Sequence, residues 1–154
     1  MLASASSSTL DAGSLDVTLA LDPAHAAVLR QIAQGQPGSL PGDPAIYRSA
    51  LLVLDHVALT DAGARGGYFY KIYLDPSADA QKLAGSLGPF EIAAARQRGT
   101  ASLRYTLVDA LKAWGAQPMP ALTVSFRQTG SAGASGPLIR IGSVRLELST
   151  EASN

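Results

Sequence analysis

The chain has 154 residues, which suits one domain with a sizeable hydrophobic core. Twelve basic and twelve acidic residues leave no net charge, so we expect no nucleic-acid or anionic-membrane partner. The absence of cysteine excludes a disulfide, a thiolate zinc site and a cysteine nucleophile. No apolar run approaches the roughly 18 residues of a membrane span, so we expect a soluble chain and assign it to no compartment.

The two ends of the chain are polar and differ from the segment between them. Residues 1–13 have neither the basic nor the apolar region of a secretory signal, so we predict a disordered start or a linker. Residues 14–149 are predicted to form a single β-rich domain. The polar residues 150–154 are predicted to be a frayed tail.

The first part of this domain predicts a strand followed by a helix. Apolar and polar residues alternate over 14–21, which is typical of a strand with one buried face. Asp22 is a candidate N-cap, Pro23 fits the first helical position and Gly35 fits the stop. A short helix is therefore predicted between Asp22 and Gly35.

The middle of the chain predicts extended structure. Residues 50–59 are apolar on both faces, which favours a central strand. In the next strand, over 68–75, one face carries Tyr68, Tyr70, Ile72 and Leu74, and the other carries Phe69, Lys71, Tyr73 and Asp75. Residues 82–96 are interpreted as short extended pieces interrupted by glycine, and residues 100–105 as a further strand.

The last part predicts a helix and two strands. Thr106 is a candidate cap for a helix that ends at Gly115, with Asp109 completing a variant capping box. The core face of that helix is Leu107, Ala110, Leu111 and Trp114. Strands are predicted over 120–128 and over 138–148, the latter broken at Gly142.

These elements predict a mainly β fold. About seven short strands with one or two short helices favour an antiparallel β-sandwich or a barrel-like domain. The residues whose side chains could take part in catalysis or metal binding do not form a recognisable catalytic set. His25 and His56 lie on separate elements, so structural roles are favoured over metal ligation, and no serine occurs in a G-x-S-x-G turn. A non-catalytic domain is therefore expected.

Five segments, in order, resemble the C-terminal domain of polyphenol oxidases and tyrosinases, the type-3 copper enzymes. The segment "FYKIYLD" at 69–75 is similar to the K-F-D-V-Y-V-N strand of plant members. Tyr70 stands at the Phe position, Ile72 and Leu74 at the valines, and Tyr73 at the Tyr. Phe69 and Lys71 depart from the Lys and Asp of that pattern. The other similar segments are "ALLVLDHVAL", "KLAGSLGPFEI", "ASLRYTLVDALKAWGA" and "LIRIGSVRLEL".

The resemblance implies a lid domain. In the family, six histidines of a separate catalytic domain hold two copper ions, whereas this chain has two histidines and is expected to bind no cofactor. The implied lid packs over that copper site in a latent pro-enzyme until it is removed or displaced. The family's blocking loop matches residues 95–100 here, so Gln97, Arg98 and Thr100 are candidate plug residues, with an ordinary solvated loop as the alternative.

Several alternatives stay open. Tyr68 and Tyr70 are interpreted as core residues and Tyr73 as packing on the opposite face, although a tyrosine that enters a copper site as a substrate mimic is the sharper possibility. The chain is alternatively a separate caddie or copper chaperone acting on a tyrosinase in trans. It is alternatively an unrelated binding module, which an exposed aromatic platform around Phe69 and Tyr73 would favour. The neutral, apolar composition also predicts self-association of the isolated chain.

Overall fold

The computed structural model describes residues 3–5, 8–10, 15–61, 64, 68–74, 80–99, 102–114, 121–130 and 138–151. These residues form eleven strands in three antiparallel sheets, with three helices and one 3-10 turn, which confirms the predicted mainly β class. The strand order is linear in each sheet, and the described residues contain no closed barrel.

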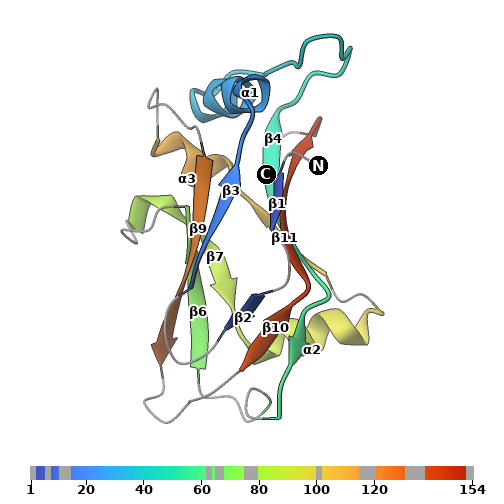
Figure 1. Ribbon diagram of the computed structural model, residues 1–154, viewed down its shortest axis with the longest axis vertical. Helices are drawn as coiled ribbons and strands as arrows, with labels where there is room; N and C mark the ends of the chain where they lie inside the picture. Colours follow the sequence, from blue (N-terminus) through green and yellow to red (C-terminus); the bar gives the residue numbers. More distant parts are fainter. Residues whose placement is uncertain are drawn as a thin grey trace.

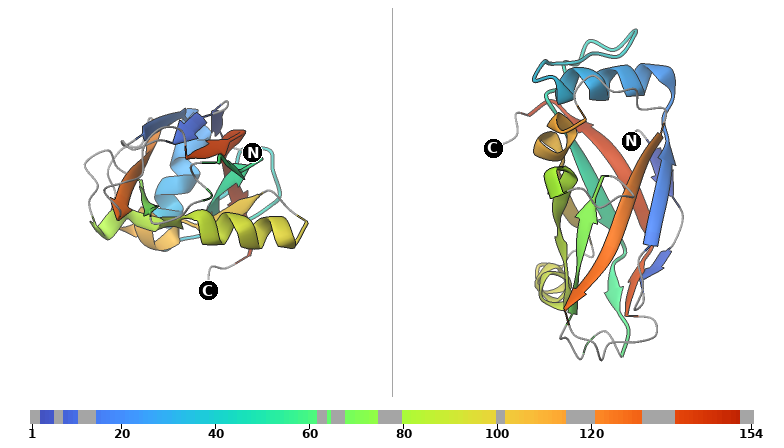
Figure 2. Two further views of the ribbon diagram at one scale, coloured as in Figure 1. Left: turned by 90° about the horizontal axis from the view of Figure 1, so that it is seen from below. Right: turned by 90° about the vertical axis from the view of Figure 1, so that its left-hand side faces the viewer.

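Two four-stranded sheets face each other across the core (Figures 1 and 2). The first sheet has the order β1 (Ala3–Ala5), β11 (Ser143–Ser149), β4 (Ser49–Asp55) and β8 (Leu103–Thr106). The second has the order β3 (Leu15–Ala20), β9 (Ala121–Gly130), β6 (Tyr68–Tyr73) and β7 (Leu83–Leu87). A third, smaller sheet joins β2 (Ser8–Leu10), β10 (Ile139–Ile141) and β5 (Ala58–Leu59).

The helices lie around these sheets. Helix α1 (Pro23–Ala33) lies across one end, whereas α2 (Pro89–Gln97) follows β7 and lies near the opposite end (Figure 1). Helix α3 (Val108–Lys112) follows β8 and packs against α1. The 3-10 turn η2 (Ala80–Lys82) leads into β7 and contacts α3.

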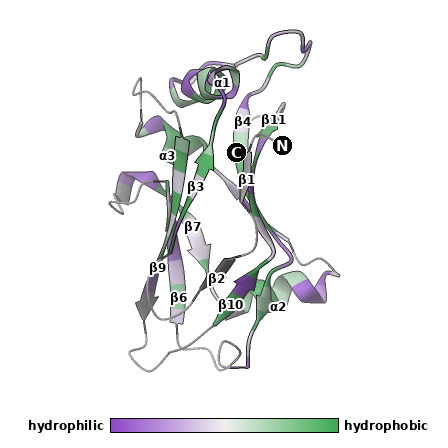
Figure 3. Cartoon of the chain, viewed as in Figure 1, coloured by the Kyte–Doolittle hydropathy of each residue, from purple (hydrophilic) through white to green (hydrophobic). Residues whose placement is uncertain are grey.

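The core lies between the inward faces of the two large sheets. In the first sheet, Leu52 pairs with Leu146, and both side chains are fully buried. In the second, Ile72 pairs with Phe126, and both are again fully buried. Figure 3 shows hydrophobic residues along these facing strands. Because side chains alternate across a strand, every second residue of each sheet contributes to this one core.

A contact between an aromatic ring and a glycine joins the edges of the two large sheets. The ring of Tyr105 on β8 lies over Gly85 on β7, so close that a Cβ at Gly85 would be 2.5 Å from the ring. The Tyr105 hydroxyl donates to the Ser86 carbonyl at 3.0 Å. Burial, with a smaller effect of the nearby Glu91 carboxylate, raises the pKa of Tyr105, so the hydroxyl stays protonated and able to donate. Glycine at position 85 is therefore required by the packing.

Helix α1 has both predicted ends. The Asp22 side chain accepts a hydrogen bond from the His25 backbone N–H at 2.8 Å, and Pro23 begins the helix. At the other end Gly35 adopts φ 79°. The backbone N–H groups of Gly35 and Gln36 donate to the carbonyls of Ile32 and Gln31 in a Schellman motif. The buried face of α1 is formed by Val28, Leu29, Ile32 and Ala33.

The predicted strand over 50–59 is interrupted. His56 adopts φ 52°, and the chain passes from β4 in one sheet to β5 in another. Gly142 lies against this bend, donating its N–H to the Asp55 carbonyl at 2.8 Å, and it separates β10 from β11 as predicted. His56 is therefore an exposed bend residue and does not share the buried face of Leu52 and Leu54.

Three other expectations were wrong in part. In place of a disordered start over 1–13, Ala3–Ala5 pairs with β11 and Ser8–Leu10 pairs with β10. The segment after Gly88 is the helix α2 rather than extended pieces. Thr106 ends β8 and caps no helix, because α3 begins after Leu107 without a side-chain cap.

In the predicted tail, the Glu151 carbonyl accepts from the Ser49 hydroxyl at 2.8 Å, and residues 152–154 lie outside the described part.

The contact between Tyr105 and Gly85 makes a testable prediction about stability. We expect Gly85→Val to lower the free energy of unfolding by about 1–3 kcal/mol, because the added side chain collides with the ring. Urea unfolding measures the change. Ser86→Ala is the control, because only its backbone carbonyl takes part in the contact. The same loss from Gly85→Val in a Tyr105→Leu background would contradict this explanation.

Candidate functional site

The strand that carries the family resemblance is an interior element of the fold. β6 pairs with β9 on one side and β7 on the other. Tyr70, Ile72 and Leu74 are fully buried, and Tyr73 lies half-buried on the opposite face. Tyr68 is 5% exposed and packs edge-to-face with Tyr70, with ring centroids 5.9 Å apart. This strand therefore holds the core together and offers neither buried ring to a partner.

The core helix also matches its predicted face. Leu107, Ala110 and Leu111 are buried, and Trp114 is half-buried. The Lys82 ammonium lies 4.0 Å from the centroid of the Trp114 ring, in a cation–π geometry. These residues anchor η2 and α3 to the sheets rather than forming a site.

The candidate plug residues lie at the end of α2. Ala95 is a buried helical residue, Gln97 is the last residue of the helix, and Arg98 is its C-cap. Residues 95–97 are thus helical rather than part of a loop, because the preceding Gly88–Pro89 pair starts a helix that the sequence interpretation missed. Gln97 and Arg98 are exposed, and Thr100 lies outside the described residues.

The first turn of α2 presents a large exposed aromatic side chain. Phe90 is 82% exposed. Nearby, Phe69 of β6 is 37% exposed, and its Cβ would lie 3.3 Å from a Cβ built on Gly88. Tyr73 is half-buried, so Phe69 and Tyr73 present little of the exposed aromatic surface that would favour an unrelated binding module. Nothing in the sequence indicated that Phe90 is exposed, because residues 82–96 were interpreted as extended pieces rather than as a helix. Its exposure follows from its position in the first turn of α2.

A network of charged side chains crosses the outer face of the first large sheet. The Asp55 carboxylate accepts from Arg145, from the Ser102 hydroxyl at 2.8 Å and from the Ser143 hydroxyl at 3.2 Å. The Arg145 guanidinium, with the two hydroxyl hydrogen bonds, outweighs burial and lowers the pKa of Asp55 from 3.8 to about 2. These contacts join β4, β11 and Ser102, the residue before β8, on the solvent side of the sheet.

The same network extends to a second carboxylate. Arg145 also donates to Glu147, and Arg104 lies 3.9 Å from Glu147. Val53 is fully buried and pairs with Arg145 on one side and Arg104 on the other. Two positive and two negative groups alternate here, so the network is neutral and its charges are already paired. Its evident role is to stabilise the sheet and shield Val53.

The described residues contain no group of three or more His, Cys, Asp or Glu side chains that could hold a metal ion. His25 lies on α1, with its Nδ1 2.8 Å from Asp22, and His56 is the exposed bend residue after β4. The two histidines therefore lie on separate elements with separate environments.

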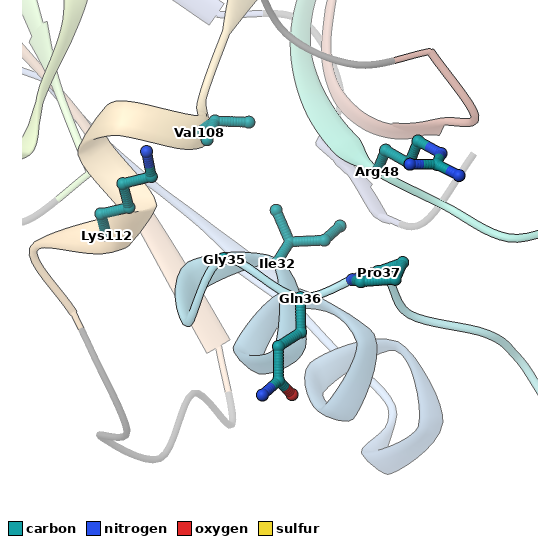
Figure 4. Close-up of a pocket in the computed structure, with 7 residues that line it drawn as sticks. All are labelled: Ile32, Gly35, Gln36, Pro37, Arg48, Val108 and Lys112. Atoms are coloured by element: carbon teal, nitrogen blue, oxygen red, sulfur yellow. The ribbon is translucent and has the colours of Figure 1, made fainter.

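One cavity of about 250 Å³ lies between α1 and α3. Its lining is Ile32, Gly35, Gln36, Pro37, Arg48, Val108 and Lys112 (Figure 4). Ile32 and Val108 lie in the middle of this set, with Lys112 and Arg48 on opposite sides of them. No sequence signal indicated this cavity, because its lining comes from segments far apart in the chain.

Comparison with known proteins gives matches to solved structures only. No family model matches the sequence, and neither does any curated protein. Latent apple tyrosinase matches with 12% identity and a TM-score of 0.47, over 92% of this chain and 27% of that chain. Recombinantly expressed latent aurone synthase, a polyphenol oxidase, matches with 12% identity and a TM-score of 0.48, over 89% of this chain and 24% of that chain.

A further structure of aurone synthase, co-crystallised with hexatungstotellurate(VI), matches with 12% identity and a TM-score of 0.49 over 92% of this chain. The chain thus spans about a quarter of the length of the solved chains that it matches. At this identity the matches assign neither an activity nor a site residue to the chain. Within the described residues, no helix has the length and apolar character needed to cross a membrane.

The Asp55 network predicts a defined dependence of stability on pH. The folded pKa of Asp55, about 2, lies below its ordinary value of 3.8. The stability it contributes is therefore present above about pH 4 and is lost as the pH falls towards 2. We expect Asp55→Asn to lower the free energy of unfolding at pH 7 by about 1–3 kcal/mol and to flatten its decline between pH 4 and 2.

Urea unfolding at several pH values measures both effects. Asp61→Asn is the matched control, because Asp61 is exposed and lies outside this network. A variant that keeps the full decline of the native protein between pH 4 and 2 would contradict the assignment of that decline to Asp55.

Proposed function

We propose that this chain is a non-catalytic lid domain of a tyrosinase or polyphenol oxidase. The lid covers the dinuclear copper site of the catalytic domain and keeps the pro-enzyme latent until the lid is removed or displaced. The copper ions belong to that partner domain, and this chain contributes no ligand to them.

The observation that carries the proposal is the order of the five similar segments, together with their place in one fold. Residues 50–59 supply most of β4 and all of β5, 69–75 supply most of β6, and 82–92 supply β7 and the start of α2. The remaining two segments supply β8 with α3 and β10 with β11. Segments that resemble one family in sequence thus form most of the strands around a single core. Sequence similarity in all five segments is expected if they must pack together around the same core.

The exposed surface of α2 supports the lid role. The helix buries Ile92 and Ala95 against the protein, while Phe90, Gln97 and Arg98 remain exposed. Phe90 and Gln97 lie about 10 Å apart along the helix axis, at about 1.5 Å per residue. The narrow entrance of the catalytic domain's active site would therefore accept either Phe90 or Gln97, but not both. The polar end carries the residues that the resemblance implies, and the aromatic end carries the larger apolar side chain.

The histidines of this chain do not fit a dinuclear copper site. His25 is paired with the N-cap Asp22, and His56 lies in the exposed bend after β4. Latency would therefore come from steric exclusion of the phenolic substrate. Tethering raises the effective concentration of a lid to the order of mM, so a modest interface suffices while the lid is attached.

The proposal predicts that this chain inhibits the catalytic domain of its own parent tyrosinase when the two are fused. We expect that catalytic domain, joined to this chain through a cleavable linker, to oxidise catechol at least tenfold faster after the linker is cleaved and the mixture is diluted. Gln97→Ala and Arg98→Ala should each raise the activity of the uncleaved fusion if the polar end of α2 enters the site. Catechol oxidation, followed by absorbance before and after cleavage, measures the effect.

Two controls accompany this assay. Phe90→Ala tests the aromatic end of α2, and Arg140→Ala, at an exposed residue of β10, tests for a general effect of surface substitutions. A fusion that is fully active before cleavage would overturn the lid proposal. Activation by Phe90→Ala alone would keep the lid and reject Gln97 and Arg98 as the plug.

A further inference from the structure

We propose that the cavity between α1 and α3 binds a small carboxylate with a short aliphatic body. The cavity lies on surfaces that the lid proposal does not use, since α2 lines no part of it. It therefore constitutes a second, independent site on the domain. Its lining combines an aliphatic floor with two cationic side chains at the sides (Figure 4).

The floor of the cavity is aliphatic. Ile32 is 2% exposed and packs in the core, Val108 is half-buried, and Pro37 completes the apolar lining. Gly35 adds no side chain to the lining, and a Cβ built on it would meet open space. An apolar ligand body placed here removes aliphatic surface from water on both sides, which favours binding.

The charges around the cavity favour an anion. Lys112 and Arg48 are exposed, and neither forms an ion pair with any residue that the structure describes. Among the residues that the structure describes, no acidic side chain lines the cavity. The Schellman motif engages the carbonyls of Gln31 and Ile32, so the end of α1 presents fewer free oxygens to an anion. Both cations are therefore available to a ligand.

The size and chemistry of the cavity narrow the class of ligand. A volume of about 250 Å³ lies just below the range of about 300–1,000 Å³ that is typical of drug-sized ligands. Inorganic phosphate would leave the aliphatic floor unused, and a neutral hydrocarbon would leave the cations unused. A six-carbon fatty acid uses both, with its carboxylate at Lys112 or Arg48 and its chain over Ile32 and Val108.

Titration of the whole, ¹⁵N-labelled chain with hexanoate tests the proposal by NMR. We expect saturable shifts at backbone amides of residues 32–36, 48, 108 and 112, with a dissociation constant on the order of 1 mM for so small a ligand. Hexanamide, which has the same shape without the charge, should bind at least tenfold more weakly. Inorganic phosphate should also bind more weakly, because it has no apolar body.

Two charge reversals provide the matched comparison. Lys112→Glu should weaken hexanoate binding at least tenfold, whereas Arg140→Glu, the same charge change on an exposed residue of β10, should leave it within twofold. Equal binding of hexanoate and hexanamide would overturn the proposal. So would a loss of affinity that is the same in both variants, because it would reflect net charge rather than this cavity. Neither outcome bears on the latency assay.

Discussion

The fold depends on the burial of two inward sheet faces against each other. Each large sheet is apolar on the side that faces the other, and the strand pairs Leu52 with Leu146 and Ile72 with Phe126 lie within that layer. Neither sheet could remain separately solvated without exposing this surface to water. The other features follow from the same constraint. The ring of Tyr105 over Gly85 joins the sheets at one pair of edges, and α1 lies across one end.

The sequence predicted those features whose cause is local. The alternation in β3 and β6, the Asp22 cap, Pro23 and Gly35 each act within a few residues, and each appears as expected. Helix α2 was missed because Gly88 was interpreted as a break in extended structure, although Gly88 followed by Pro89 is favourable at a helix start. The strands near the N-terminus were missed because their small, polar residues have no periodicity, and their pairing depends on the edges of β10 and β11.

The candidate sites show the same division. The structural role of the tyrosines in β6 could be predicted, because alternation alone places Tyr68 and Tyr70 on the buried face. The Asp55 network could not, because it brings together residues up to 90 positions apart whose contacts depend on strand register. The cavity lined by Ile32 and Lys112 likewise requires the packing of α1 on α3. The exposure of Phe90 required knowledge of the helix that carries it.

The pairing of β4 with β11 also sets the order of events during synthesis. Every residue of β4, from Ser49 to Asp55, pairs with a residue between Ser143 and Ser149. The pairing of β4 with β11 therefore cannot form until β11 has been synthesised. Contacts at such a separation form slowly, because a long loop must close before any energy is gained. Until then the apolar strand β4 has no partner on that side. A nascent chain of this domain therefore passes through a stage in which an apolar strand edge is exposed to aggregation and to chaperones.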